Sequence, residues 1–297
     1  MQTQKKLRLP STRVQAYLIL VFLSLIWGTS YILIKKGVAV FSPYQVGYLR
    51  LMVSALAFTP FLFFIWKKID WSKWPYFLLV GLTGTAIPSL LFPLAQTEIS
   101  SSIAGILNSL TPLFTLILGL LFFKNRFARN KLLGVLLGLG GAACLILLGN
   151  EVGLQGNLWY SLFVLLACFC YATSSNVVGY FFQNTSSLTI SAVSFIMVGI
   201  PATIMLFTTD FTTVLETDEN AWEAVGYIVI LALASTVLAS VIFFKLIQMT
   251  TPLFSSMVSY LVPAVAVGWG LVDGESITIL HFLGMFLILV GVYLSRS

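Results

Sequence analysis

The stretch FPLAQTEISSSIAGILNSLTPLFTLILGLLFFKN, residues 92–125, decides the fold because the chain contains a second version of it. Residues 243–276 read FFKLIQMTTPLFSSMVSYLVPAVAVGWGLVDGES. Each stretch is followed by a glycine-containing apolar segment, KLLGVLLGLGG at 131–141 and HFLGMFLILVG at 281–291. This repetition indicates that the chain consists of two related halves.

The composition excludes a water-soluble domain. Hydrophobic residues make up 59% of the 297 residues and charged residues make up 9%, whereas an average soluble domain contains roughly 25% charged residues. The sixteen Lys and Arg residues outnumber the ten Asp and Glu residues, but they lie between apolar segments. They therefore do not form the basic patch that binds nucleic acid, and we expect no nucleic-acid partner. The lipid bilayer is the expected solvent of this chain.

Ten apolar segments are long enough to cross about 30 Å of hydrocarbon as helices. They show no two-residue alternation, which favours helices over a β-barrel, and a helix satisfies its own backbone hydrogen bonds in lipid. We therefore expect an all-α membrane protein with ten transmembrane helices. The expected spans are 17–34, 44–66, 74–95, 100–123, 132–148, 158–181, 188–207, 222–247, 253–272 and 279–294.

The charges in the connections predict the orientation, because basic residues of short loops collect on the cytoplasmic side. Basic residues dominate the N-terminal tail and the loops after the second and fourth spans, and acidic residues dominate the loops on the opposite side. Both termini are therefore expected in the cytoplasm, with the protein in a bacterial cytoplasmic membrane. Lys35 and Lys36 are exceptions at the other face, where we expect them to extend from the end of the first span to the interface.

The two halves are expected to be inverted relative to each other. Pro112 corresponds to Pro263, and Gly134 corresponds to Gly284. Because each half contains five expected spans, equivalent helices must cross the membrane in opposite directions, as in many transporters. The expected division is a cytoplasmic N-terminal tail at 1–16, a first five-helix repeat at 17–150 and a second five-helix repeat at 157–297.

The chain resembles the EamA-type transporters of the drug/metabolite transporter superfamily over nearly its whole length. The resemblance rests on WGTSY at 27–31, Arg50 in the second span, SSSIAGILNSLTPLFT at 100–115 and the paired glycine-containing segments. It implies ten helices in two inverted five-helix repeats, which enclose a central cavity and work by alternating access. It also implies that amino acids or other small metabolites are moved, usually outward.

One departure from the family concerns an acidic position. Lys124 and Asn125 replace the usual Gly-Glu pair after the fourth span, whereas Gly274 and Glu275 keep the pair after the ninth span. The departure weakens any role for this acid in the first half and leaves the expected fold unchanged.

Ten side chains are expected to contact a solute in the central cavity. Polar groups in the middle of a span rarely face lipid, because lipid would leave their hydrogen bonds unsatisfied. In the fourth and ninth spans polar residues precede Pro112 and Pro263. A proline frees a carbonyl one turn back, so both helices are expected to be interrupted near the middle of the membrane. Aromatic walls with scattered amides and hydroxyls suit an uncharged or zwitterionic solute. The expected substrate-binding residues are Trp27, Ser30, Tyr31, Arg50, Asn108, Ser109, Tyr171, Asn176, Ser259 and Tyr260.

Arg50 has two interpretations, because an ionised side chain inside a span is costly and is therefore a functional candidate. In the first, its guanidinium holds a substrate carboxylate or bonds the carbonyls at a helix end. In the second, it extends to the outer interface and braces a neighbouring helix. The central parts of the expected spans contain no Asp or Glu. We therefore expect facilitated or exchange transport rather than proton coupling.

The sequence predicts a secondary transporter that exports a small metabolite such as an amino acid. The alternatives are a membrane receptor or scaffold without flux, and an intramembrane enzyme. The enzyme is disfavoured because His281 is the single histidine and the chain contains no GxSxG or HExxH motif. We expect no cofactor and no metal. The expected partners are a small-molecule substrate and the lipid bilayer, and the expected oligomeric state is a monomer.

Overall fold

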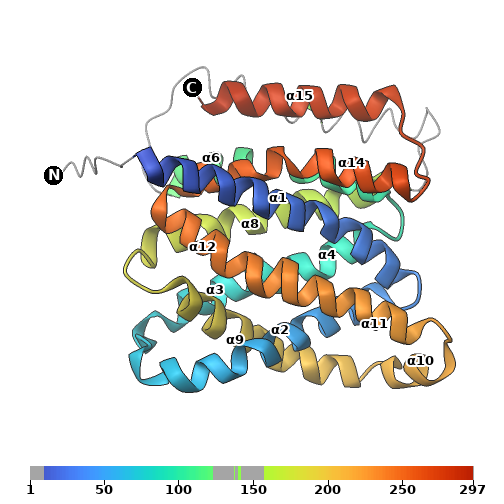
Figure 1. Ribbon diagram of the computed structural model, residues 1–297, viewed down its shortest axis with the longest axis horizontal. Helices are drawn as coiled ribbons and strands as arrows, with labels where there is room; N and C mark the ends of the chain where they lie inside the picture. Colours follow the sequence, from blue (N-terminus) through green and yellow to red (C-terminus); the bar gives the residue numbers. More distant parts are fainter. Residues whose placement is uncertain (1–9, 123–136, 138–139, 142–156, 297) are drawn as a thin grey trace.

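The computed structural model of the chain describes residues 10–122, 137, 140–141 and 157–296. Within these ranges all regular elements are helices, which run alongside one another in one bundle (Figure 1). In the described part of the chain, eight helices are long and apolar enough to cross a membrane, and Ile279–Val290 is a shorter apolar helix. These nine helices correspond to nine of the ten expected spans. The remaining expected span, the fifth at 132–148, lies largely outside the described residues. The all-helical prediction is confirmed for the described part of the chain.

The first half begins with two long helices, α1 (Pro10–Val38) and α2 (Pro43–Ile65). A capping box sets the start of α2. Gln45 N donates to Ser42 Oγ, and Ser42 N donates to Gln45 Oε1, so that two free backbone donors are satisfied. The remaining elements of this half are η1 (Trp66–Lys68), η2 (Trp71–Lys73), α3 (Trp74–Gly81), η3 (Leu82–Ala86), α4 (Ile87–Ala95), α5 (Ser101–Asn108) and α6 (Thr111–Phe122).

The second half ends in a helix at the edge of the bundle, α15 (Ile279–Arg296), which packs on α5 and α6 (Figure 1). The preceding elements are η4 (Leu158–Tyr160), α8 (Ser161–Phe181), α9 (Ser187–Phe207), α10 (Phe211–Thr217), α11 (Ala221–Ile230), η5 (Leu231–Leu238), α12 (Ala239–Met249), α13 (Pro252–Ser256), η6 (Met257–Tyr260) and α14 (Val262–Val272).

The fourth and ninth spans are interrupted just before their prolines, as the sequence predicts. In the fourth span α5 ends at Asn108 and α6 begins at Thr111. In the ninth span the narrow helix η6 and Leu261 separate α13 from α14. Proline causes such breaks because it has no N–H and its ring displaces the carbonyl one turn back.

The third and eighth spans each contain a π-helical segment in their middle, η3 and η5. A π-turn widens the helix by one residue and is found mainly at functional sites. Small residues occupy both segments, including Gly84 in η3 and Ser235 in η5. These two segments were not predicted from the sequence.

The two halves interleave in the bundle. α1 packs on α14, α2 on α9, and α4 and α6 on α8. Glycines permit the close approach that lipid-embedded helices need in order to pack without a hydrophobic driving force. A Cβ at Gly28 of α1 would clash with Val265 of α14, and a Cβ at Gly199 of α9 would clash with Ala55 of α2. The core therefore belongs to both halves together.

Candidate solute-binding cavity

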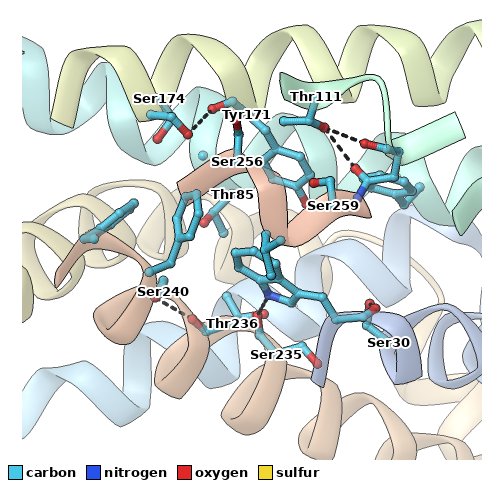
Figure 2. Close-up of a pocket in the computed structure, with 18 of the residues that line it drawn as sticks. Ser30, Thr85, Thr111, Tyr171, Ser174, Ser235, Thr236, Ser240, Ser256 and Ser259 are labelled. Atoms are coloured by element: carbon cyan, nitrogen blue, oxygen red, sulfur yellow. Dashed lines mark hydrogen bonds between the residues drawn. The ribbon is translucent and has the colours of Figure 1, made fainter. Parts of the chain in front are cut away.

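A cavity of about 80 Å³ lies inside the bundle, between the two halves. This volume is several times what one water molecule needs. Side chains from α1, α2, η3, α4, α5 and α6 line it from the first half, and side chains from α8, α9, η5, α12, α13 and η6 line it from the second. Figure 2 shows labelled members of this lining, with Tyr171 and Ser174 across the space from Ser235 and Thr236.

Seven of the ten predicted binding residues line this cavity. They come from five helical elements that are far apart in the sequence. They are Trp27, Ser30, Tyr31, Arg50, Asn108, Tyr171 and Ser259.

The other three predicted residues do not line the cavity. Ser109 is fully buried, and its hydroxyl donates to Ile106 O at 2.5 Å. Asn176 Nδ2 donates to Thr115 O at 3.1 Å and to Ala172 O at 2.9 Å, so this side chain joins α8 to α6. Tyr260 borders a separate recess against α15. The expectation that all ten share one cavity is therefore wrong for these three.

Much of the cavity lining was not predicted from the sequence. The missed polar members include Thr85 of η3 and Ser235, Thr236 and Ser240 around η5. The missed aromatic members are Phe92, Phe195, Phe243 and Phe244. The available signal was the two runs of small and hydroxyl residues inside apolar spans, GLTGTA at 81–86 and ALASTVLAS at 232–240.

Trp27 is held in place by the opposite half. Its indole Nε1 donates to Ser235 O at 2.9 Å, and its ring meets Phe243 edge to face at a centroid distance of 5.0 Å. In return Ser235 Oγ donates to Ile26 O at 3.3 Å. These contacts fix the indole ring of Trp27 in α1 against η5, at one wall of the cavity.

A second aromatic wall runs from α1 through α4 to α8. Tyr31 and Phe92 form an edge contact with a centroid distance of 5.6 Å, and Phe92 stacks with Tyr171 at 5.9 Å. Aromatic faces of this kind accept apolar or cationic parts of a solute.

Two polar groups beside these walls have hydrogen-bonding capacity to spare. Asn108 Nδ2 has no hydrogen-bond partner among the described residues, whereas its Oδ1 accepts from Thr111 Oγ1 at 3.3 Å. Ser174 Oγ is buried without a partner among the described residues. A buried polar group left unpaired is costly, so the hydroxyl of Ser174 is suited to bind a polar solute, and the amide of Asn108 can donate to one from the cavity wall.

Arg50 lies inside the bundle and not at the interface. Its side chain is 7% exposed, and its Nε donates to Thr236 Oγ1 of η5 at 2.6 Å. The expectation that Arg50 extends to the membrane surface is therefore wrong, whereas the expected contact with a neighbouring helical segment is present.

A second polar cluster joins the halves at one end of α1. Lys35 Nζ lies 2.7 Å from Asp273 Oδ2 and 3.0 Å from Glu275 Oε1, and Lys36 Nζ lies 2.7 Å from Asp273 Oδ1. Both lysines therefore have carboxylate partners at this end of α1, which the sequence did not predict. Gly274 makes the turn with φ of 79°, a conformation that favours glycine.

The carboxyl groups of this cluster are kept ionised. Burial raises the pKa of Glu275, but hydrogen bonds from Ser102, Lys35 and two backbone amides outweigh burial and place the pKa below its ordinary value. Hydrogen bonds from Lys35 and Lys36 lower the pKa of Asp273. The cluster is therefore a set of ion pairs at neutral pH.

Comparison with known proteins gives one consistent result. The model of the EamA-like transporter family matches residues 14–147 and 158–297. A protein of Archaeoglobus fulgidus described as an uncharacterized transporter is 22% identical over 282 residues, which cover 95% of this chain and 98% of that protein. The inner membrane transporter YedA of Escherichia coli, described as uncharacterized, is 27% identical over 278 residues, which cover 92% of this chain and 87% of YedA.

A solved crystal structure has the same fold. It superposes with a TM-score of 0.63 at 17% sequence identity and covers 95% of this chain and 96% of its own. The apolar helical bundle and its family match define an integral membrane transporter, which acts on a small-molecule substrate in a lipid bilayer. The chain belongs to the EamA-like transporter family.

Proposed function

We propose that this protein is a secondary transporter that exports a small metabolite, such as an amino acid, by alternating access. The observation that carries the proposal is the position of the cavity, which lies between the halves and is lined by both. In alternating access two halves move against each other around a solute site. A site built from both halves can therefore close when they move.

The proposed architecture has ten spans in two inverted repeats, at 17–150 and 157–297, with the tail at 1–16 and both termini in the cytoplasm. Three observations support it. The family model matches two successive segments of the chain. The third and eighth spans both contain a π-helical segment, and the fourth and ninth spans are both interrupted before a proline. Tags placed in successive loops test the topology, and an odd number of crossings would contradict it.

The lining also supports facilitated or exchange transport. Among the described residues, no carboxylate or imidazole lines the cavity, whereas proton-coupled carriers typically bury such groups. Flux into proteoliposomes should therefore not change when a pH gradient is imposed. Uphill uptake driven by that gradient would contradict this part of the proposal.

An unbiased metabolite screen identifies the solute. Cells that express the protein should release at least one metabolite faster than cells that express no transporter, and the purified protein in liposomes should exchange that metabolite. Saturable binding without exchange would instead indicate a receptor or scaffold.

Two pairs of variants test whether the cavity is the solute site. Trp27→Ala and Asn108→Ala alter the lining, whereas Trp222→Ala and Asn184→Ala make the same changes at exposed positions. At equal membrane abundance, the cavity variants should lose most of the flux and the exposed variants should keep it. Equal flux in all four variants would show that the cavity is not the site.

A further inference from the structure

Arg50 is a buried cation without a counter-ion among the described residues. Its side chain is 7% exposed, and the ion pairs of the described chain involve Lys35, Lys36 and Lys73 instead. A buried charge without a partner is strongly unfavourable. An anionic group that enters beside Arg50 would remove this cost.

The guanidinium has donors free for such a group. Arginine has five N–H donors in a planar fork that matches a carboxylate. One donor, at Nε, binds Thr236 Oγ1 at 2.6 Å. The four N–H donors at Nη1 and Nη2 have no hydrogen-bond partner among the described residues, and the side chain borders the cavity.

The rest of the lining contributes no opposing charge. Among the described residues around the cavity, Arg50 alone is ionised, and the others are hydroxyl, amide, aromatic, aliphatic or glycine residues. A cationic solute would therefore be repelled by Arg50 without an acid to attract it. The ammonium group of a zwitterion would find hydroxyl oxygens and the aromatic faces of Trp27 and Phe243 instead.

Thr236 is placed to orient the guanidinium. It lies in the π-helical segment η5, which packs against α2. Its hydroxyl also donates to Leu231 O at 3.4 Å, so the oxygen lone pairs are directed towards Arg50 Nε. With Nε held in this way, the Nη edge of the fork is the part left for a ligand.

We propose that the cavity selects solutes that carry a carboxylate and no net positive charge, with Arg50 as the anionic-group ligand and Thr236 as its positioning residue. The proposal rests on the proposed function in one respect, that this cavity is the solute site. It adds the charge class of the substrate, which family membership does not specify.

Matched pairs of probes test the charge class on the purified full-length protein. The probes are hexanoate with hexanamide, and 3-phenylpropionate with 3-phenylpropionamide, because each pair differs mainly in charge. Phenylalanine and phenethylamine add a zwitterion and a cation. Binding is read as the rise in melting temperature and as quenching of tryptophan fluorescence, since Trp27 lines the cavity. We expect the carboxylates to bind at least about tenfold more tightly than their amides, and phenethylamine not to bind.

Variants show whether Arg50 is responsible. Arg50→Gln should abolish the preference for carboxylate over amide, and Arg50→Lys should keep part of it because the charge remains. Lys245→Gln, which removes an exposed cation outside the cavity lining, should leave the preference unchanged. If Arg50→Gln does not fold, the Arg50→Lys result decides, because a preference fully equal to that of the wild-type protein would contradict a role for the arginine fork.

Thr236 is tested by rescue. Thr236→Val should reduce the carboxylate preference, and Thr236→Ser should restore it, while Thr173→Val, at a half-buried position outside the cavity lining, should not change it. A loss of melting temperature without a change in preference would indicate a purely structural role and would contradict the positioning role.

The remaining outcomes separate this inference from the proposed function. Equal binding of acids and amides, or binding of chloride and inorganic phosphate without any response to the organic acids, would overturn the charge class. A transported metabolite with a net positive charge would also overturn it and leave the transport proposal intact. Carboxylate-selective binding without exchange in liposomes would contradict transport and support the charge class.

Discussion

Ser102 Oγ donates to Glu275 Oε2 at 2.6 Å and joins the start of α5 to the turn after α14. The same carboxylate accepts from Ser101 N at 3.0 Å, from Ser102 N at 3.1 Å and from Lys35 Nζ at 3.0 Å. All these donors belong to the first half of the chain, whereas Glu275 belongs to the second. A carboxylate at a helix N-terminus is stabilised by the free amides and by the helix dipole. Glu275 therefore caps α5 from the other half and ties the two halves together.

Replacement of Glu275 by Gln should destabilise the protein. The variant keeps the shape of the side chain but loses the charge. Its NH₂ group would face hydrogen-bond donors of Ser101, Ser102 and Lys35 and could not accept from them. We expect a loss of about 1.5–3 kcal/mol in the free energy of unfolding, as for other hydrogen bonds to charged groups. Melting of the detergent-solubilised protein measures the effect. Glu219→Gln, at an exposed position, is the matched control, and equal melting of both variants would contradict the capping role.

Acid should weaken this cluster. The pKa values of Glu275 and Asp273 are lower in the folded protein than their ordinary values, so both carboxylates stabilise the fold fully above the ordinary pKa of about 4. That stabilisation is lost as the pH falls through the lowered pKa values. The difference in melting temperature between the wild-type protein and Glu275→Gln should therefore be constant near neutral pH and shrink in acid. A difference that grows as the pH falls would show that the direction is wrong.

Asn176 should matter for stability and not for solute choice. Its amide joins α8 to the carbonyl of Thr115 in α6, and the side chain is 8% exposed. Asn176→Ala should lower the free energy of unfolding by about 1–2 kcal/mol, because the carbonyls of Thr115 and Ala172 both lose the hydrogen bond from this amide. The relative affinities for different solutes should not change. If the variant changes these relative affinities at full stability, Asn176 belongs to the solute site after all.

A side chain at Gly84 should fill part of the cavity. A Cβ at this position in η3 would lie 2.5 Å from Ser174 Oγ, which is too close without a local shift. Gly84→Val should weaken solute binding by about tenfold or more, which corresponds to about 1.4 kcal/mol and is in the range known for overpacking. Gly226→Val is the control, since a Cβ there meets nothing within 4 Å. Equal solute affinity in the two variants would exclude Gly84 from the site.

The fold was largely predictable because lipid imposes strong constraints on sequence. The eighth span was expected at 222–247 and is observed at Ala221–Met249. An apolar segment of this length is typical of a transmembrane helix and of few other structures. The breaks before Pro112 and Pro263 followed from the chemistry of proline. The π-helical segments did not follow, because a one-residue widening of a helix depends on how neighbouring helices pack and leaves only a weak compositional signal in the sequence.

The site was only partly predictable. The sequence of one span shows which face of the helix is polar, but it does not show which other helices pack against that face. Tyr171 was correctly predicted, and Ser174 lines the same cavity, since three residues along a helix return close to the same face. Asn176 lies about 140° around the helix from Tyr171, at 3.6 residues per turn, and therefore points to α6. Arg50 was recognised as a candidate because a charged side chain within a span is energetically costly in lipid. Its partner Thr236 is 186 positions away, and no local sequence pattern indicates that the two side chains meet.

The interleaved packing of the halves has a consequence for biosynthesis. The first half leaves the ribosome and enters the bilayer while its packing partners have not yet been translated. During that interval Lys35 has no carboxylate to bind, and Gly28 has no Val265 to pack against. The early helices must then remain loosely associated within the insertion machinery or the surrounding lipid. A premature stop codon before Glu275, even one late in the gene, would yield an incompletely assembled protein that quality-control proteases can degrade.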